Sequence, residues 1–177
     1  LDARQVHKVE PALNFSSTMR YPIHGGVLQR RGGTGRHDAV AWGFARAANA
    51  AGVDIIQNCE VTDVVLEGGR CTGVNTSLGE IRAGVVGAAV AGHSSVLAQM
   101  AGYELPITSY VLQAFVSEPI KPVLNSVVLS PPFGTYASQS DKGGLVIGGG
   151  LDRIPSYGQR GNMPVQEHVL GAFCEMY

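Results

Sequence analysis

A glycine-rich segment that leads directly into an alanine-rich stretch is the feature that most limits how this chain can fold. Residues 30–38 read RRGGTGRHD, and residues 38–51 read DAVAWGFARAANAA. In the second stretch the apolar side chains recur at the three- and four-residue spacing of a helix, which Thr34 or Asp38 can cap and Gly52 can end. The sequence therefore predicts a helix over residues 38–51 that begins at a glycine-rich loop.

After this helix the pattern changes to short β-branched and apolar runs, which indicate strands. The predicted strands cover residues 53–57, 60–67, 70–76 and 80–87, with turns at 68–69 and 78–79. Residues 85–91 are continuously apolar, as in a strand buried on both faces, and Gly92 separates them from a predicted helix at 95–101. A strand, a glycine and a helix in this order are typical of an α/β ligand site at the carboxyl end of a strand.

From Ile107 onward the pattern is all β. The predicted strands cover residues 109–118, 126–130, 135–140 and 144–149, and prolines separate them because proline cannot donate to a sheet. Pro164 can begin a last helix that runs to Tyr177, whereas residues 1–20 are expected to hold one helical turn at most, stopped by Pro11. The predicted fold is α/β, with a layer of helices and parallel strands followed by an antiparallel sheet.

Charge and composition exclude several classes of protein. The chain has 13 Lys and Arg against 14 Asp and Glu, so it lacks the basic surface that nucleic-acid binding requires. No stretch reaches the roughly 20 apolar residues of a membrane helix, and no apolar signal region begins the sequence. The three cysteines lack metal-ligand spacing, so we expect no metal site and free thiols in a reducing cytoplasm. Glycine is abundant, at 24 of 177 residues, which favours close approach of the backbone to a ligand or partner.

The glycine-rich loop carries the densest group of candidate functional residues. Its glycines let the backbone approach a ligand, the following helix presents free N–H groups to an anion, and Arg30, Arg31 and Arg36 add positive charge. His37 ends the loop, and a neutral imidazole is available as a nucleophile at neutral pH. One interpretation is a phosphate-bearing cofactor with His37 as a contact or nucleophile. The other is a glycine-rich connection with a solvated basic face.

A second candidate lies at residues 89–95, which read AVAGHSS. Gly92 can hold a cofactor at the strand end, or it can form a tight turn between strand and helix. Ser94 and Ser95 can cap that helix, but they lack the G-x-S-x-G setting of a hydrolase nucleophile. The run of glycines at 148–150 allows close approach of another group, or it forms a bulge in an edge strand.

Four stretches of the sequence resemble one known family. They are residues 25–62 (GGVLQRRGGTGRHDAVAWGFARAANAAGVDIIQNCEVT), 90–102 (VAGHSSVLAQMAG), 112–124 (LQAFVSEPIKPVL) and 138–161 (SQSDKGGLVIGGGLDRIPSYGQRG). All four are similar to the β subunits of heterotetrameric sarcosine oxidases, within the D-amino-acid-oxidase-like FAD-dependent oxidoreductases. The resemblance covers nearly the whole chain, and the motifs RHDAVAWG and SQSDKGGLVIG are specific to this branch.

The resemblance implies two flavin sites. In the family, FMN is attached through its 8α carbon to the histidine of the RHD motif, which is His37 here. Non-covalent FAD meets the backbone of the valine in the CEVT motif, which is Val61 here. To these the sequence pattern adds Arg36 and Gly92 as expected cofactor contacts.

The resemblance also implies an activity and partners. Sarcosine is oxidised at FAD, electrons pass to FMN and then to oxygen, and hydrogen peroxide is formed. The imine is hydrolysed to glycine and formaldehyde, or its one-carbon unit passes to tetrahydrofolate. The implied partners are the small-molecule substrate and the other subunits of a hetero-oligomer.

The same resemblance sets the expected domain organisation. The expected parts are a substrate-domain segment at 1–30, a portion of a Rossmann-like FAD-binding domain with an antiparallel crossover at 31–108, an antiparallel substrate-domain portion at 109–163, and the start of a truncated helix at 164–177. The family's G-x-G-x-x-G unit and the segment that closes over the flavin ring are not among these residues. We therefore expect an internal piece of a longer subunit, with apolar faces exposed.

Two alternatives stay open. One is a related oxidoreductase that acts on another secondary amine, because the motifs do not define the substrate pocket. The other is a non-catalytic fold fragment or binding module that lacks the FAD pyrophosphate site. Flavin absorption that survives acid precipitation would identify a covalent flavoprotein and separate it from the second alternative.

Overall fold

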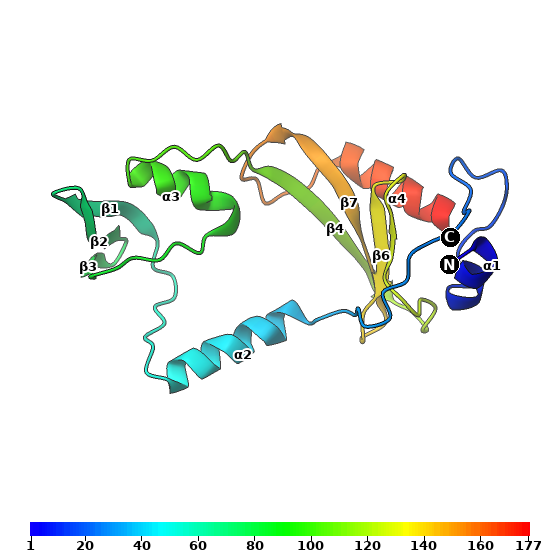
Figure 1. Ribbon diagram of the computed structural model, residues 1–177, viewed down its shortest axis with the longest axis horizontal. Helices are drawn as coiled ribbons and strands as arrows, with labels where there is room; N and C mark the ends of the chain where they lie inside the picture. The colour runs from blue at the N-terminus through cyan, green and yellow to red at the C-terminus, as the bar shows by residue number, and fades with distance from the viewer. The chain divides into compact units, whose positions relative to one another are not determined.

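The computed structural model describes all residues from 1 to 177. The chain forms two compact units, and Figure 1 shows their helices and strands coloured in chain order. Unit 1 comprises residues 1–35, 110–154 and 158–177, and unit 2 comprises residues 36–109 and 155–157. The predicted α/β class is confirmed, and the sheets are antiparallel. The assignment of these parts to FAD-binding and substrate domains stays a prediction. None of the helices is both long and apolar enough to cross a membrane.

Unit 1 is built on a four-stranded sheet with the strand order β4-β7-β6-β5. Its strands are β4 (Tyr110–Pro119), β5 (Val128–Ser130), β6 (Thr135–Gln139) and β7 (Gly144–Pro155). The four strands predicted after Ile107 are therefore confirmed. Strand β7 continues past its predicted end through Gly149 and Gly150, whose φ angles of 139° and 67° are ones that other residues rarely adopt.

Helix α4 (Met163–Met176) packs against β6 and closes the hydrophobic core of unit 1. The side-chain oxygen of Asn162 caps this helix by accepting a hydrogen bond from the Val165 N–H, and Pro164 occupies the first turn as predicted. The core beneath it contains Met19, Phe133, Ala172 and Met176, with Val128 packed against them.

Helix α1 (Ala3–Val9) is longer than the single turn expected from the sequence. Asp2 and Gln5 form a capping box, in which each side chain accepts a hydrogen bond from the main-chain N–H of the other. The helix ends before Pro11, as expected, because proline cannot continue it. The spacing of Asp2 and Gln5 is thus the local signal that extends the helix.

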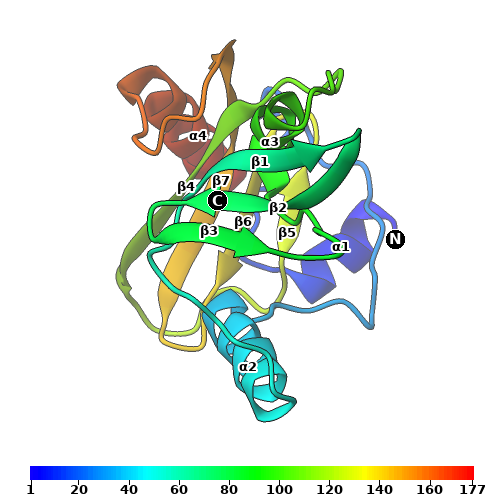
Figure 2. The same ribbon diagram turned by 90° about the vertical axis from the view of Figure 1, so that its left-hand side faces the viewer.

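Unit 2 begins with helix α2 (His37–Ala50), which confirms the helix predicted at residues 38–51. A three-stranded sheet follows, in which β1 (Val61–Glu67), β2 (Arg70–Thr76) and β3 (Gly79–Arg82) lie side by side with β2 in the middle (Figure 2). Gly68 and Gly69 form its first turn with φ angles of 57° and 78°, as a tight hairpin requires. The third strand is shorter than predicted and ends at Arg82.

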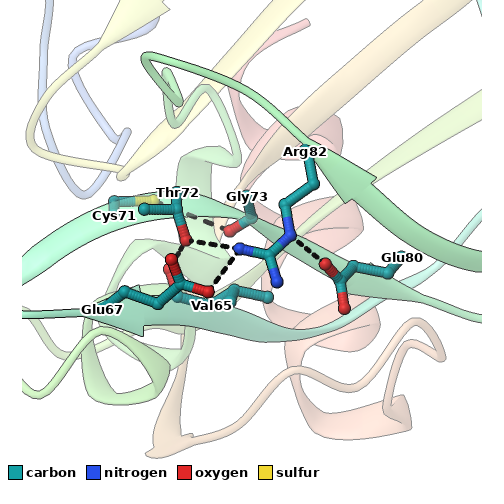
Figure 3. Close-up of polar contacts among 7 residues, drawn as sticks. All are labelled: Val65, Glu67, Cys71, Thr72, Gly73, Glu80 and Arg82. Carbon is teal, nitrogen blue, oxygen red and sulfur yellow. Dashed lines mark hydrogen bonds and ion pairs between the residues drawn. The ribbon is translucent and has the colours of Figure 1, made fainter.

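Arg82 joins the three strands of this sheet through polar partners (Figure 3). Its Nη1 donates to Glu67 Oε1 at 2.5 Å and to Thr72 Oγ1 at 3.1 Å, and its Nε donates to Glu80. The hydrogen bonds to Glu67 and Glu80 raise the pKa of Arg82 above its ordinary value. The charged guanidinium on β3 therefore contacts β1, β2 and its own strand, which favours one register.

Two strands predicted from the sequence, at residues 53–57 and 85–91, are wrong, because neither run pairs with another strand. Val53 and Val85 are 51% and 87% exposed. An apolar run forms a strand only where a neighbouring backbone accepts its hydrogen bonds, and these residues have no such neighbour in the chain. The predicted layer of parallel strands is therefore not formed. The second run leads instead into η1 (Ala91–His93) and α3 (Ser94–Met100).

Helix α2 has no buried residue despite its apolar composition. Trp42 and Phe44 are 59% and 76% exposed. Helices of this length are marginal in water on their own, because most helix stability in proteins comes from packing. The exposed apolar faces expected from the sequence are thus confirmed on α2 and on the two unpaired runs.

Candidate functional site

The start of α2 places Arg36, His37 and Asp38 in consecutive positions. Arg36 is the N-cap residue but makes no side-chain capping bond, and the first N–H groups of a helix have no acceptor within it. Asp38 Oδ1 accepts a hydrogen bond from the Ala39 N–H at 2.8 Å, and Asp38 Oδ2 accepts one from Arg36 Nη2 at 3.2 Å. These two hydrogen bonds lower the pKa of Asp38 below its ordinary value. The turn therefore holds an ion pair beside His37.

His37 is the first residue of α2, and its side chain is exposed. Its imidazole makes no hydrogen bond and no ring contact. By contrast, His7 packs edge-on against Phe15 at 4.7 Å between ring centroids, and His93 stacks on Tyr157. An unengaged imidazole at a helix start can serve as a nucleophile or a ligand contact in its neutral form.

The loop that precedes α2 in sequence contains glycines that the chain itself does not require. Gly33 and Gly35 have no positive φ, and a Cβ at either position would meet no atom within 4 Å. Gly32 differs, because its N–H closes a turn onto the Gln29 carbonyl at 3.1 Å and a Cβ there would lie 3.3 Å from that oxygen. The open space around Gly33 and Gly35 fits a loop that a ligand approaches closely.

Val61 begins β1, an edge strand of the three-stranded sheet. Its Cα lies opposite that of Thr76, and the register shifts between Val61 and Asp63. Because β2 is the one neighbour of β1, the other edge of the β1 backbone is unpaired. A free strand edge presents main-chain N–H and C=O groups that a ligand can pair with.

Gly92 lies in the short turn of η1 before α3. Its carbonyl accepts a hydrogen bond from the Ser109 hydroxyl at 2.5 Å, and the preceding Ala91 has a φ of 45°. A Cβ on Gly92 would meet the Ser109 oxygen at 3.6 Å, an ordinary contact, so packing does not demand glycine here. The predicted caps of α3 are wrong: the hydroxyls of Ser94 and Ser95 donate to main-chain carbonyls outside that helix.

The predicted cofactor residues all belong to unit 2, but no interaction joins them to form one site. Arg36 and His37 lie at the start of α2, Val61 on β1 and Gly92 in η1. No hydrogen bond, ion pair or ring contact connects these three places. Each place is open to a ligand in a different way. The start of α2 has an imidazole without a hydrogen bond, β1 has an unpaired strand edge, and η1 has a turn without a side chain at Gly92. Their roles in binding stay predictions.

One feature of unit 1 escaped the sequence analysis: the face of its sheet that carries Tyr136. Gly148 lies opposite Tyr136, and Tyr136 lies opposite Leu129, so these three residues share a face. A Cβ on Gly148 would collide with the Tyr136 ring, and Leu129 is 68% exposed. The glycine at 148 is therefore a position of close approach, and the group that approaches it is Tyr136.

A hollow of about 1210 Å³ also lies in unit 1, between the loop at 21–34 and residues 124–133. The carboxylate of Glu10, which is 2% exposed, belongs to its wall. Arg30, Gly32 and Gly33 of the glycine-rich loop line this hollow, whereas Arg36, His37, Val61 and Gly92 do not. The hollow therefore borders the glycine-rich loop that the sequence singled out as a place of close ligand approach.

The sequence matches the family described as FAD dependent oxidoreductase over residues 1–177. It is 58% identical over 167 residues to the sarcosine oxidase subunit beta of Rhizobium meliloti (strain 1021), covering 94% of this chain and 40% of that protein. It is 51% identical over 177 residues to the sarcosine oxidase subunit beta of Arthrobacter sp, covering 100% of this chain and 44% of that protein. The chain thus spans less than half the length of these curated relatives.

A more distant relative has a different name. The chain is 34% identical over 109 residues to the D-amino acid dehydrogenase of Rhizobium rhizogenes (strain K84 / ATCC BAA-868), covering 60% of this chain and 25% of that protein. The identities to the two sarcosine oxidase β subunits confirm the family resemblance that the sequence motifs indicated.

Two solved structures share the fold. L-proline dehydrogenase from P. horikoshii matches with a TM-score of 0.89 at 24% identity, over 99% of this chain and 47% of that chain. Glycine oxidase from Bacillus cereus ATCC 14579 matches with a TM-score of 0.81 at 22% identity, over the same shares of the two chains. At these identities the likeness concerns the fold alone.

Proposed function

Because the chain belongs to the FAD-dependent oxidoreductase family, we propose that it is the part of a sarcosine oxidase β-type subunit that carries the covalent flavin. The observation that carries this proposal is His37, an exposed imidazole that makes no hydrogen bond or ring contact at the first residue of α2. The glycines at 33 and 35, which the fold does not require, precede it directly in the sequence. Identities of 58% and 51% to sarcosine oxidase β subunits support the proposal.

The start of α2 would hold FMN through one covalent bond and several polar contacts. The imidazole of His37 would be bonded covalently to the 8α carbon of the flavin. The first N–H groups of α2 and the guanidinium of Arg36 would face the phosphate, since a helix N-terminus and an arginine both attract anions. Arg36 already pairs with Asp38, so its share in phosphate binding requires that this exposed ion pair open or be shared.

FAD would meet unit 2 at Val61 and Gly92. The unpaired edge of β1 at Val61 offers main-chain groups, and the turn at Gly92 offers an approach without a side chain. When bound, FAD would accept the two electrons removed from the amine, and FMN would pass them to oxygen. The overall reaction would convert sarcosine, oxygen and water into glycine, formaldehyde and hydrogen peroxide.

The proposed partners follow from the same relationship. They are a small secondary amine as substrate, the other subunits of a hetero-oligomer, and tetrahydrofolate as an alternative acceptor of the one-carbon unit. The name of the relatives, subunit beta, supports assembly with other subunits. The free cysteines at positions 59, 71 and 174 support a reducing, cytoplasmic location.

The test is the substitution His37→Ala in the full-length, assembled enzyme. We expect acid-stable flavin to be lost while FAD stays bound. Turnover with oxygen should fall because the FMN that accepts electrons from FAD is then missing. His24→Ala is the matched control, since His24 is also exposed and lies in the loop before α2. Acid-stable flavin that persists in the His37→Ala enzyme would contradict the proposal.

A related oxidoreductase that acts on another amino acid is the second candidate, and the likeness to a D-amino acid dehydrogenase favours it. Anaerobic mixing of the full-length enzyme with sarcosine, proline and D-alanine in turn would rank the substrates by the rate of flavin bleaching. We expect sarcosine to be fastest. A full-length protein that binds no flavin would instead identify a non-catalytic binding module.

A further inference from the structure

The segment Pro155–Tyr157 belongs to unit 2, although its neighbours in sequence on both sides belong to unit 1. A main-chain hydrogen bond and a ring pair join it to unit 2. The Ser156 N–H donates to the Ser109 carbonyl at 3.1 Å, and the ring of Tyr157 stacks on the imidazole of His93 at 4.6 Å between centroids and 24° between planes. Within unit 2 a main-chain hydrogen bond and a ring pair thus join this segment of three residues to its neighbours.

Both contacts converge on the turn that contains Gly92. His93 is the next residue after Gly92, and the hydroxyl of Ser109 donates to the Gly92 carbonyl at 2.5 Å. Ala91, on the other side of Gly92, has a φ of 45°. A left-handed alanine persists only where surrounding contacts outweigh its cost, so the turn depends on the groups that hold it.

We propose that Tyr157 is a positioning residue for the flavin: its ring, stacked on His93, keeps the Gly92 turn in the conformation that binds FAD. The proposal rests on the proposed function, because the FAD contact at Gly92 is itself proposed. Tyr157 is 44% exposed and its hydroxyl makes no hydrogen bond, so the ring rather than the phenol oxygen carries the effect.

The first experiment measures the turn without bound FAD. In the full-length protein from which the non-covalent FAD has been removed, we expect the amides of residues 91–93 to exchange hydrogen faster in Tyr157→Ala than in the wild type. Tyr157→Phe keeps the stacked ring and should restore the wild-type rate. Tyr103→Ala is the matched control, since Tyr103 is a 69% exposed tyrosine of unit 2 without a ring contact, and it should leave these amides unchanged. Equal exchange in Tyr157→Ala and wild type would overturn the proposal.

The second experiment titrates FAD back into the same FAD-free proteins and measures the dissociation constant of FAD. Stacked ring pairs contribute enough to change it by roughly two- to tenfold, so we expect Tyr157→Ala and His93→Ala to bind FAD that much more weakly. Tyr157→Phe and Tyr103→Ala should bind like the wild type. The His93 variant removes the same pair from the other side and covers the case in which Tyr157→Ala does not fold.

The outcomes separate this inference from the proposed function. A wild-type protein that binds no FAD would refute the proposed function and this inference with it. A wild-type protein that binds FAD, with an unchanged dissociation constant in Tyr157→Ala and His93→Ala, would overturn the positioning role alone. Covalent flavin at His37 should be the same in all these variants, because the pair does not contact α2.

Discussion

The carboxylate of Glu10 accepts a 2.7 Å hydrogen bond from the hydroxyl of Ser126, between residues 116 positions apart in unit 1. The same oxygen, Oε2, accepts the main-chain N–H groups of Asn125 and Ser126 at 3.3 and 3.1 Å. Glu10 is 2% exposed where α1 ends, so these bonds compensate for burying Oε2, whereas Oε1 is buried without a hydrogen-bond partner. They join the end of α1 to the segment that leads into β5.

Ser126→Ala should weaken unit 1 by about 1.5–3 kcal/mol, the usual contribution of a hydrogen bond to a charged group. Hydrogen exchange of the amides of β6 in the full-length protein measures this loss. Ser130→Ala is the control, because Ser130 lies in the same sheet and its hydroxyl makes no hydrogen bond; its effect should stay within about 0.5 kcal/mol. Equal losses of stability in the two variants would show that the hydrogen bond to Glu10 does not stabilise unit 1.

Tyr177 buries its hydroxyl oxygen without a hydrogen-bond partner. A buried polar atom without a partner is unfavourable, and its removal by a substitution of the same shape is neutral or stabilising. Tyr177→Phe should therefore raise the free energy of unfolding of unit 1 by up to about 1 kcal/mol. Hydrogen exchange of β6 again provides the measurement, and a loss of stability would mean that the hydroxyl has a partner after all.

The same residue predicts how stability changes in alkali. Burial, and then the negative charge of Glu10, raise the pKa of Tyr177 above its ordinary value of 10.0. The folded chain therefore holds the hydroxyl proton of Tyr177 more tightly than the unfolded chain does. The contribution of this protonated group to the free energy of unfolding is complete below pH 10 and is lost as the pH rises above it. We expect the melting temperature to fall above that pH in the wild type, and to fall less steeply in Tyr177→Phe. Parallel curves for the two proteins would contradict this.

Gly33→Ala should separate the needs of the fold from those of a ligand. A Cβ at this position meets no atom within 4 Å and φ is not positive, so the fold should gain about 0.4–1 kcal/mol through a less flexible unfolded chain. In the full-length enzyme we expect less covalent flavin, measured by absorbance after acid precipitation. Gly52→Ala is the contrasting control: its φ of 87° should cost stability by about 1–2 kcal/mol without affecting the flavin directly. Full flavin content in Gly33→Ala would show that the loop tolerates a side chain.

The elements that sequence patterns predicted well are those that depend on local information. Helix α2 has its own periodicity, and β2 follows a turn formed by two glycines, Gly68 and Gly69, so both agree with prediction closely. The runs at 53–57 and 85–91 have strand composition, but a strand also needs a neighbour, which composition cannot reveal. Their failure therefore reflects missing partners and not misread residues.

The candidate site divides in the same way. The loop before His37 was visible as a local pattern of glycine and arginine, whereas its assignment to FMN, and that of Val61 to FAD, required a family resemblance. The stacking of Tyr157 on His93 was not predictable, and the glycine run indicated a close approach at Gly148 but not that Tyr136 makes it. Such pairs are determined by the tertiary fold, and no local spacing of residues in the sequence predicts them.

The mass of the peptide that contains His37 tests the central claim most directly. Full-length enzyme is purified with its acid-stable flavin and digested with trypsin, and the peptides are identified by mass spectrometry. We predict that the peptide with His37 carries the added mass of FMN and that fragmentation places it on the imidazole. An unmodified His37 peptide, with the acid-stable flavin on another peptide or on none, would contradict the account.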